Sequence, residues 1–442
     1  MTPDSDDAGL EEEALPTPDV EGDPVTVVEG DLDEVVDEEP EKPPPPLLEL
    51  RDGLPPLTET PPALADACQA LAAASGPVAI DAERAWGYRY SSRAYLIQLR
   101  REGAGSFLID PIGFDSSLES LQEALAGTEW ILHASTQDLP CLNEVGLAPA
   151  TLFDTELAGR LLGYPRVGLA TLVETLLGYR MKKEHSAADW STRPLPGPWL
   201  EYAALDVEVL IELREVLARE LHEAGKDEWA RQEFDWLRGF TPFVRTEPWR
   251  RTSGLHRVRG RRLLGAVREL WEERDELARS RDVSPGRIIG DNAIVAAAMA
   301  DPATRGDLLS TKGFHGRGAQ RYADRWVAAL ARARALPEDD LPVRAPRTDG
   351  PPTPRAWAER DPVAAERLTL ARDGMAQLSE QLEVPAENLL TPDTVRRVMW
   401  EPAGADLPAL RDQLRALGAR EWQIELTAPM LLESVAGAQS ED

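Results

Sequence analysis

Three short apolar segments that lie close together in the chain restrict the fold most strongly. VAID (78–81), AYLIQL (94–99) and SFLID (106–110) are separated by turn-forming residues, which is the pattern of consecutive strands. A helical pattern over 118–125 and a fourth strand-like segment, EWILHA (129–134), follow them. Strands that come first and then alternate with helices predict an α/β domain with a mixed β-sheet.

Strand-like segments are confined to this first region. Residues 198–221 have apolar side chains at helical spacing and predict one long helix, with Pro198 in its first turn. Further along, helical patterns fill about 255–335 and about 355–436, on either side of a Pro-rich, charged linker. The sequence therefore predicts an α/β domain followed by two all-α domains.

The two helical regions resemble each other in sequence. ELARSRDVSPGRIIGDNAI and QLSEQLEVPAENLLTPDTV align without a gap at an offset of 101 residues. Val283 then matches Val384, and Ile288 matches Leu389. A consistent apolar pattern at a fixed offset predicts a duplicated helical domain.

Charge is distributed unevenly along the chain. The whole sequence has a net charge of −30, but residues 1–50 contain 18 Asp and Glu and only one Lys. Residues 241–335 instead contain 18 Arg and one Lys against 11 acidic residues. The acidic total therefore does not exclude a polyanion such as nucleic acid as a partner. Residues 1–50 also have few large apolar side chains outside short Val and Leu pairs, and they are predicted to be disordered.

These patterns divide the chain into six segments. We predict an acidic, Pro-rich disordered tail (1–51), the α/β domain (52–222), a connecting helix and linker (223–250), a first helical domain (251–336), a linker (337–354) and a second helical domain (355–437).

Composition also indicates the setting in which the chain works. No run of about 18 apolar residues predicts a membrane span, and the acidic start lacks the features of a signal peptide. Two Cys in 442 residues argue against a disulfide framework or a disulfide-linked partner. We expect a protein of the reducing cytoplasm, favour a monomer and expect no membrane partner.

Acidic residues recur at the ends of the predicted elements. Asp81 and Glu83 end the first strand and project to the same side of it, where like charges repel. Alone, this pair would indicate a solvated strand end. Asp138 follows the fourth strand, and Tyr202 and Asp206 lie one turn apart on the predicted helix 198–221.

Four carboxylates that converge in one domain need compensating positive charge. Divalent cations with oxygen ligands supply it, and two such ions can clamp an in-line phosphoryl displacement. We expect Asp81 to bridge two metals, Glu83 and Asp206 to complete one of them, and Asp138 to hold the other. The Tyr202 hydroxyl would then orient a water, although an ordinary core tyrosine is the alternative.

The order D-x-E, D and Y-x-x-x-D resembles the DEDDy class of 3′–5′ exonucleases, and most closely the ribonuclease D family. FDTELAGRLLG (153–163) and HSAADWSTRPLP (185–196) support the resemblance. The helical domains resemble HRDC domains, which bind nucleic acids, through RGDLLSTKGFHGRGAQRYADRW (305–326). The resemblance covers about residues 55–435 and implies an RNase H-like fold for the α/β domain.

The resemblance also implies an activity. Family members are Mg²⁺- or Mn²⁺-dependent 3′–5′ exoribonucleases that release nucleoside 5′-monophosphates from RNA 3′ ends, including those of tRNA precursors. It carries over a catalytic set, which is Asp81, Glu83, Asp138, Tyr202 and Asp206. One departure is Arg84, because the family often has an aromatic or apolar residue there that lies near the terminal nucleotide. Trp86 or Tyr88 is then the candidate for stacking on a base.

Further residues are candidates for contact with RNA. They are His133, Lys183, Arg193, Arg261, Lys312 and Arg317. Each has a structural alternative. His133 suits a structural histidine at a strand end, and Lys183 suits a solvated surface. For Arg193 we favour a structural role in the loop before the catalytic helix, and the other three also suit the solvated side of an Arg-rich bundle.

Two other functions remain open from the sequence. The first is a DNA 3′–5′ exonuclease of the same fold, although no polymerase- or helicase-sized region and no GxxxxGK[ST] phosphate loop is present. The second is an RNA-binding protein that has lost its metals, which the intact acidic set disfavours. Stepwise shortening of RNA, compared with DNA, separates the three.

Overall fold

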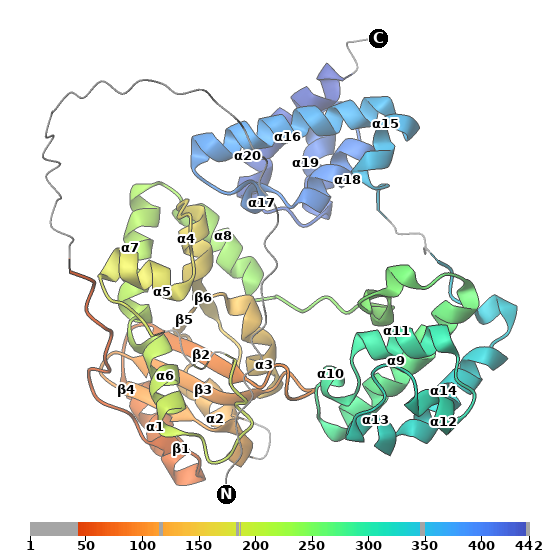
Figure 1. Cartoon of the computed structure of the whole chain (residues 1–442). Coiled ribbons are helices and arrows are strands. Elements are labelled where there is room, and N and C mark those ends of the chain that lie inside the picture. Colours follow the sequence, from red (N-terminus) through yellow and green to blue (C-terminus); the bar gives the residue numbers. More distant parts are fainter. Residues whose placement is uncertain (1–42, 115–117, 183–184, 186, 345–349, 439–442) are drawn as a thin grey trace, which may run out of the picture. The chain divides into compact units, whose positions relative to one another are not determined.

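The computed structural model describes residues 43–114, 118–182, 185, 187–344 and 350–438 (Figure 1). Most of the predicted acidic tail, residues 1–42, lies outside this part. The folded α/β domain nevertheless begins earlier than predicted. Leu48 is buried, and its backbone N–H donates a hydrogen bond to the Arg180 carbonyl. The apolar residues at the end of the predicted tail therefore belong to the domain core.

A six-stranded sheet forms the centre of the α/β domain. Its strands are β1 (Leu57–Thr58), β2 (Val78–Arg84), β3 (Ala94–Arg101), β4 (Gly105–Ile109), β5 (Glu129–Leu132) and β6 (Thr151–Asp154). They lie in the order β1-β4-β3-β2-β5-β6, and β2, β3 and β4 run antiparallel while the other pairs are parallel. The predicted mixed sheet and its four predicted strands are confirmed. The short strands β1 and β6 were not predicted.

Helices cover both faces of this sheet (Figure 1). They are α1 (Pro61–Ala73), α2 (Glu119–Ala124), α3 (Leu139–Glu144), α4 (Thr155–Leu161), α5 (Leu169–Leu172), a π-helical turn (Val173–Leu177), α6 (Gly197–Glu208) and α7 (Leu210–Glu223). Nearly every residue of β3 is buried, as expected for a strand covered on both sides. Leu96 packs with Ala203 of α6, whereas Ile97 and Leu99 enter a larger core that includes α1 and α7.

The predicted single helix over 198–221 is two helices. Val209 has φ −118° and ψ 6°, so α6 ends before it and α7 begins after it. The buried carboxylate of Glu208 lies at this break, 3.3 Å from Nη1 of Arg100, and it also accepts from the backbone N–H of Arg51. The break therefore lies beside a buried carboxylate whose charge is compensated from β3.

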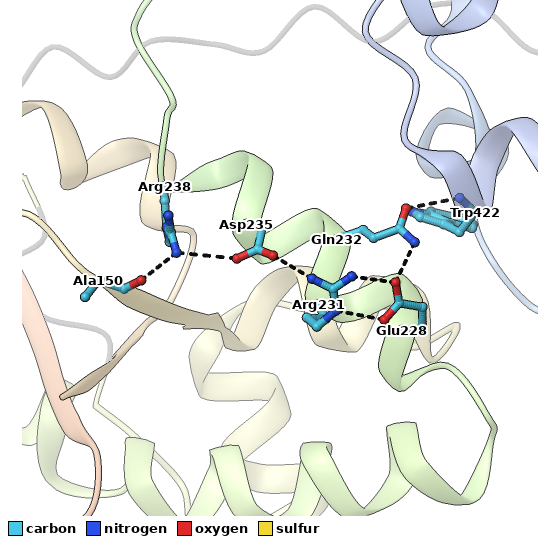
Figure 2. Close-up of polar contacts among 7 residues, drawn as sticks. All are labelled: Ala150, Glu228, Arg231, Gln232, Asp235, Arg238 and Trp422. Atoms are coloured by element: carbon cyan, nitrogen blue, oxygen red, sulfur yellow. Dashed lines mark hydrogen bonds and ion pairs between the residues drawn. The ribbon is translucent and has the colours of Figure 1, made fainter. Parts of the chain in front are cut away.

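Helix α8 (Asp227–Leu237) follows the α/β domain, and the contacts of its side chains and of the adjacent Arg238 reach both Ala150 of that domain and Trp422. Figure 2 shows its polar side chains between Ala150 and Trp422. Arg238 donates to the Ala150 carbonyl just before β6. The side-chain oxygen of Gln232 accepts from the backbone N–H of Trp422 at 3.1 Å. The Trp229 and Trp422 rings also stack, with their centroids 4.9 Å apart.

The rest of the described chain contains two groups of helices. The first group is α9 (Arg261–Arg281), α10 (Pro285–Ile288), α11 (Asp291–Ala300), α12 (Arg305–Leu309), α13 (Arg317–Arg321) and α14 (Ala323–Ala335). The second group is α15 (Trp357–Arg360), α16 (Pro362–Leu382), α17 (Ala386–Leu389), α18 (Pro392–Trp400), α19 (Leu407–Ala416) and α20 (Glu421–Gly437). Within the described ranges, no helix is long and apolar enough to cross a membrane.

The structure confirms the predicted internal similarity. Helices α9 and α16 both have 21 residues and α10 and α17 both have 4, and each pair is offset by the 101 residues seen in the sequence. The residues that end α9 and α16, Asp282 and Glu383, both adopt the left-handed conformation, with φ 46° and 52°. Helices α16 and α17 of the second group thus match α9 and α10 of the first in length and in offset.

Candidate active site

Strand β2 is the centre of the sheet and positions two of the predicted acidic residues. In its register with β3, Asp81 lies opposite Gln98, and Glu83 lies opposite Leu96. Directly opposed residues in neighbouring strands share a face. Because Leu96 packs against α6, Asp81 and Glu83 also project toward α6.

Helix α6 supplies the other side of this cluster. Carboxylate oxygens of Asp81, Glu83 and Asp206 all lie within 4.8 Å of one another. Tyr202 lies one turn before Asp206 on α6, and both side chains line the same cavity. The structure therefore brings together residues that are far apart in the sequence, as the spacing predicted.

Asp138 follows β5 in the chain, and its side chain lines the same cavity, which has a volume of about 260 Å³. It lies beyond the close group of three carboxylates, in the turn that leads into α3. The carboxylate of Asp154, at the end of β6, fixes this turn by accepting from the backbone N–H groups of Ala134 (3.3 Å) and Ser135 (2.7 Å). It also caps α4 by accepting from the backbone N–H of Leu157 at 3.0 Å.

Crowding of the carboxylates makes negative charge unfavourable in this cavity. Burial, followed by repulsion from Asp81 and its neighbours, raises the pKa of Glu83 to about 10. Burial and the same mutual repulsion also raise the pKa values of Asp138 and Asp206, and burial raises that of Asp81. Such a site favours protons or cations.

The residues in the cavity fit divalent cations. Asp81, Glu83 and Asp206 offer hard oxygen ligands at a mutual distance that one ion can span. Because burial raises the pKa of each of them, a bound cation would stabilise their charged forms. Asp138 offers a fourth carboxylate to the same cavity. Burial and the nearby Asp206 charge raise the pKa of Tyr202, so its phenol stays neutral and can donate a hydrogen bond.

Arg84 is the one cationic side chain among the described residues that line this cavity. Its Nη2 lies 3.4 Å from Oδ1 of Asp138, its Nη1 donates to the Gln137 carbonyl, and its guanidinium lies 5.4 Å from the centre of the Trp86 ring. The sequence identified Arg84 as a departure from the family pattern but did not predict its contact with Asp138.

Two predicted RNA-contacting residues have structural partners in the α/β domain. His133 lines the cavity, but its Nδ1 lies 2.8 Å from the Thr155 hydroxyl oxygen, and burial lowers its pKa. Arg193 donates to both carboxylate oxygens of Asp110, at 2.7 and 2.8 Å, and to the Tyr95 carbonyl. The structural role that we favoured for Arg193 fits these contacts, and Asp110 is a partner that the sequence did not reveal.

The remaining candidates lie outside this cavity. Arg261 donates to the carbonyls of Glu338 and Leu341, so it fastens the start of the linker to the first helical group. Lys312 and Arg317 are exposed near the start of α13. Lys183 lies outside the described residues.

Three family models match this chain. Residues 57–222 match a model described as 3′-5′ exonuclease, residues 264–330 match the HRDC domain, and residues 350–435 match a 3′ to 5′ exonuclease C-terminal domain. The second helical group, which we predicted to be HRDC-like, thus has its own family model.

Curated relatives carry the name ribonuclease D. The protein of Granulibacter bethesdensis is 31% identical over 312 residues, which cover 69% of this chain and 75% of that protein. The protein of Acidiphilium cryptum is 33% identical over 355 residues, which cover 76% of this chain and 85% of that protein.

Solved structures resemble the whole arrangement. A protein from Bifidobacterium adolescentis is 37% identical, with a TM-score of 0.82, over 89% of this chain and 100% of that chain. Escherichia coli RNase D, described as an exoribonuclease involved in structured RNA processing, is 26% identical, with a TM-score of 0.64, over 86% of this chain and 98% of that chain.

Proposed function

This chain belongs to the ribonuclease D family, and we propose that it is a metal-dependent 3′–5′ exoribonuclease. It would shorten single-stranded 3′ ends of RNA, including tRNA precursors or other structured RNAs, and release nucleoside 5′-monophosphates. The observation that carries the proposal is the convergence of Asp81, Glu83 and Asp206 within 4.8 Å, in a cavity that also contains Asp138 and Tyr202.

Two divalent cations, Mg²⁺ or Mn²⁺, are the proposed cofactors. Asp81, Glu83 and Asp206 would hold one ion, and Asp138 would hold the second together with Asp81. When bound, such ions supply positive charge for the reacting phosphate and lower the pKa of a bound water. The protein's own contribution is to hold four carboxylates, from β2, the α3 turn and α6, around one small cavity.

Tyr202 is the proposed orienting residue. It lines the cavity one turn before Asp206, and its hydroxyl stays neutral because burial and the Asp206 charge raise its pKa. A neutral hydroxyl can both donate and accept, so it can hold a water in line with the bond that breaks. The terminal phosphodiester would be cleaved by that water, with the oxygen of the shortened RNA leaving as its new 3′ hydroxyl.

The first helical group is the proposed RNA-binding part outside the active site. Lys312 and Arg317 are exposed, and in the same helical group the guanidinium groups of Arg281 and Arg321 lie over the Tyr322 ring at 5.7 and 5.6 Å. Cationic groups beside an aromatic ring suit the backbone and bases of RNA. We assign Arg193 and Arg261 to structural roles because their donors are used within the protein.

We retain the predicted domain division as a proposal, with the exonuclease domain starting before residue 52. A cytoplasmic location and a monomeric state also remain proposals. The location rests on the two free, buried thiols of Cys68 and Cys141, which suit a reducing compartment. Light scattering of the purified protein would measure the oligomeric state.

One experiment tests the activity. Purified protein is mixed with Mg²⁺ or Mn²⁺ and with matched RNA and DNA oligonucleotides labelled at the 5′ end. We expect stepwise shortening of RNA that EDTA, Asp81→Ala and Asp206→Asn each abolish. Asp66→Asn on the exposed side of α1 is the matched control and should retain activity.

Each other result has a definite meaning. Activity that persists in both active-site variants would refute the metal assignment. Faster shortening of DNA than of RNA would favour the DNA exonuclease, and RNA binding without shortening would favour a non-catalytic binding protein.

A further inference from the structure

Arg84 lies at an irregularity in the pairing of β2 with β3, and its side chain lines the catalytic cavity. The register between β2 and β3 shifts between Glu83 and Arg84, so Glu83 pairs with Leu96 and Arg84 pairs with Ala94. In a regular strand, neighbouring residues project to opposite faces. A bulge can redirect a side chain, and here Arg84 lines the same cavity as Glu83.

The redirected guanidinium lies at the one catalytic carboxylate outside the close group of three. Its Nη2 is 3.4 Å from Oδ1 of Asp138, and the two side chains are only 14% and 6% exposed. The Gln137 carbonyl and the Trp86 ring hold it on two further sides. Asp138 therefore already has a cationic partner supplied by the chain itself.

We propose that Arg84 gates cation binding at Asp138, because its guanidinium compensates that carboxylate until RNA is bound. This inference rests on the proposed function of the site. A cation that approaches Asp138 meets the like charge of Arg84, whereas the group of Asp81, Glu83 and Asp206 is open to a cation. The two positions should therefore fill at different cation concentrations.

RNA is the ligand that can release the gate. A phosphate oxygen is an anionic acceptor that matches a guanidinium at least as well as a carboxylate does. When the 3′ end of RNA enters the cavity, Arg84 can leave Asp138 and bind the phosphate. The second cation position then becomes available only when substrate is present. Trp86 is 67% exposed and offers its ring to the moving guanidinium or to a base.

Calorimetric titration of the full chain with Mn²⁺, without RNA, tests the gate independently of activity. We expect the wild-type protein to bind one ion tightly and a second weakly. Arg84→Met retains the side-chain stem but not the charge, and it should tighten the second site by about tenfold and the first by less than about twofold. Arg93→Met is the matched control, because Arg93 is an exposed residue of the same connection between β2 and β3.

A second titration compares Mn²⁺ binding by the wild-type protein with and without RNA. Adding an RNA with a non-hydrolysable 3′-terminal linkage should tighten the second site by a similar factor. A second site in Arg84→Met that matches the wild type, or is weaker, would overturn the gate, as would RNA that leaves the wild-type second site unchanged. If Arg84→Met does not fold, Arg84→Gln replaces it.

A different result of the same titrations would refute the proposed metal site. If the wild-type protein binds no Mn²⁺ that Asp81→Asn removes, then the acidic cluster is not a metal site. If Mn²⁺ binding depends on Asp81 but is insensitive to Arg84, the metal site stands and the gate alone is wrong.

Discussion

Arg193 binds Asp110 through two parallel hydrogen bonds, from Nε to Oδ2 at 2.7 Å and from Nη2 to Oδ1 at 2.8 Å. Asp110 follows β4 and is only 4% exposed. Arg193 lies in the segment just before α6, the helix that carries Tyr202 and Asp206. The ion pair therefore fixes the segment that leads into α6 to the residue that follows β4.

Arg193→Met should consequently destabilise the domain and impair catalysis without weakening RNA binding. Removing one partner of a bidentate pair leaves the Asp110 carboxylate buried, which costs about 2–4 kcal/mol. Urea denaturation measures this cost, and Arg166→Met, at an exposed arginine, is the control. A large loss of RNA affinity with unchanged stability would show instead that Arg193 contacts RNA.

Tyr202→Phe should lower kcat by about 10²-fold while KM changes little. The ring keeps its packing, and only the hydroxyl, in the cavity that Asp206 also lines, is lost. Single-turnover cleavage of RNA measures the effect on the chemical step. Activity that equals the wild type would mean that Tyr202 is an ordinary core residue.

Stability without metal should fall as the pH rises. The pKa of Glu83 increases from an ordinary value of 4.5 to about 10 in the folded protein. Between these values the folded protein holds a proton that the unfolded chain has released, so the free energy of unfolding decreases with increasing pH. Melting temperatures in EDTA should fall between about pH 6 and about pH 9, and less steeply in Glu83→Gln. Equal slopes in the two proteins would contradict the assignment.

Asp154→Asn should destabilise the turn that carries Asp138. The carboxylate accepts hydrogen bonds from the N–H groups of Ala134, Ser135 and Leu157, and an amide nitrogen cannot accept. We expect a loss of about 1–3 kcal/mol in the free energy of unfolding, together with reduced activity. Mn²⁺ binding at Asp81 should be retained, and its loss would mean that Asp154 is itself a ligand.

Glu233→Gln should loosen the attachment of α20 to α8. Glu233 is 4% exposed and accepts from Nε and Nη2 of Arg420, both at 2.7 Å, and from the Trp422 indole N–H at 2.8 Å. Leaving Arg420 without its charge partner should cost about 3 kcal/mol of stability in urea denaturation. Glu228→Gln, an exposed position on the same helix, should have little effect. Equal effects of the two variants would contradict the buried role of Glu233.

Local patterns were enough to predict much of this fold. Apolar alternation and turn residues revealed β2 to β5, and the regular offset revealed the similarity of α9 and α16. The break between α6 and α7 could not be predicted, because it lies where Glu208 meets Arg100, which is distant in the sequence. Strand β6 was not predicted either, and its place in the sheet is set by its pairing with β5.

In the candidate active site too, local sequence patterns predicted some features, whereas contacts between distant residues determine the others. The residue types and their order indicated Asp81, Glu83, Tyr202 and Asp206, which the fold brings together. The contact between Arg84 and Asp138 depends on a register shift at the end of β2, which sequence patterns do not reveal. The partners of Arg193 and Arg261 are likewise set by tertiary packing.

The pairing of Glu233 with Arg420 also matters while the chain is being made. The two residues are 187 positions apart, so the ribosome completes α8 long before it produces the partners of Glu233. Until then the nascent exonuclease domain exposes the Trp229 ring and an acidic side chain that α20 later covers. A premature stop anywhere between these residues would leave that face of α8 exposed to solvent. The stability of the exonuclease domain therefore depends on the synthesis of α20.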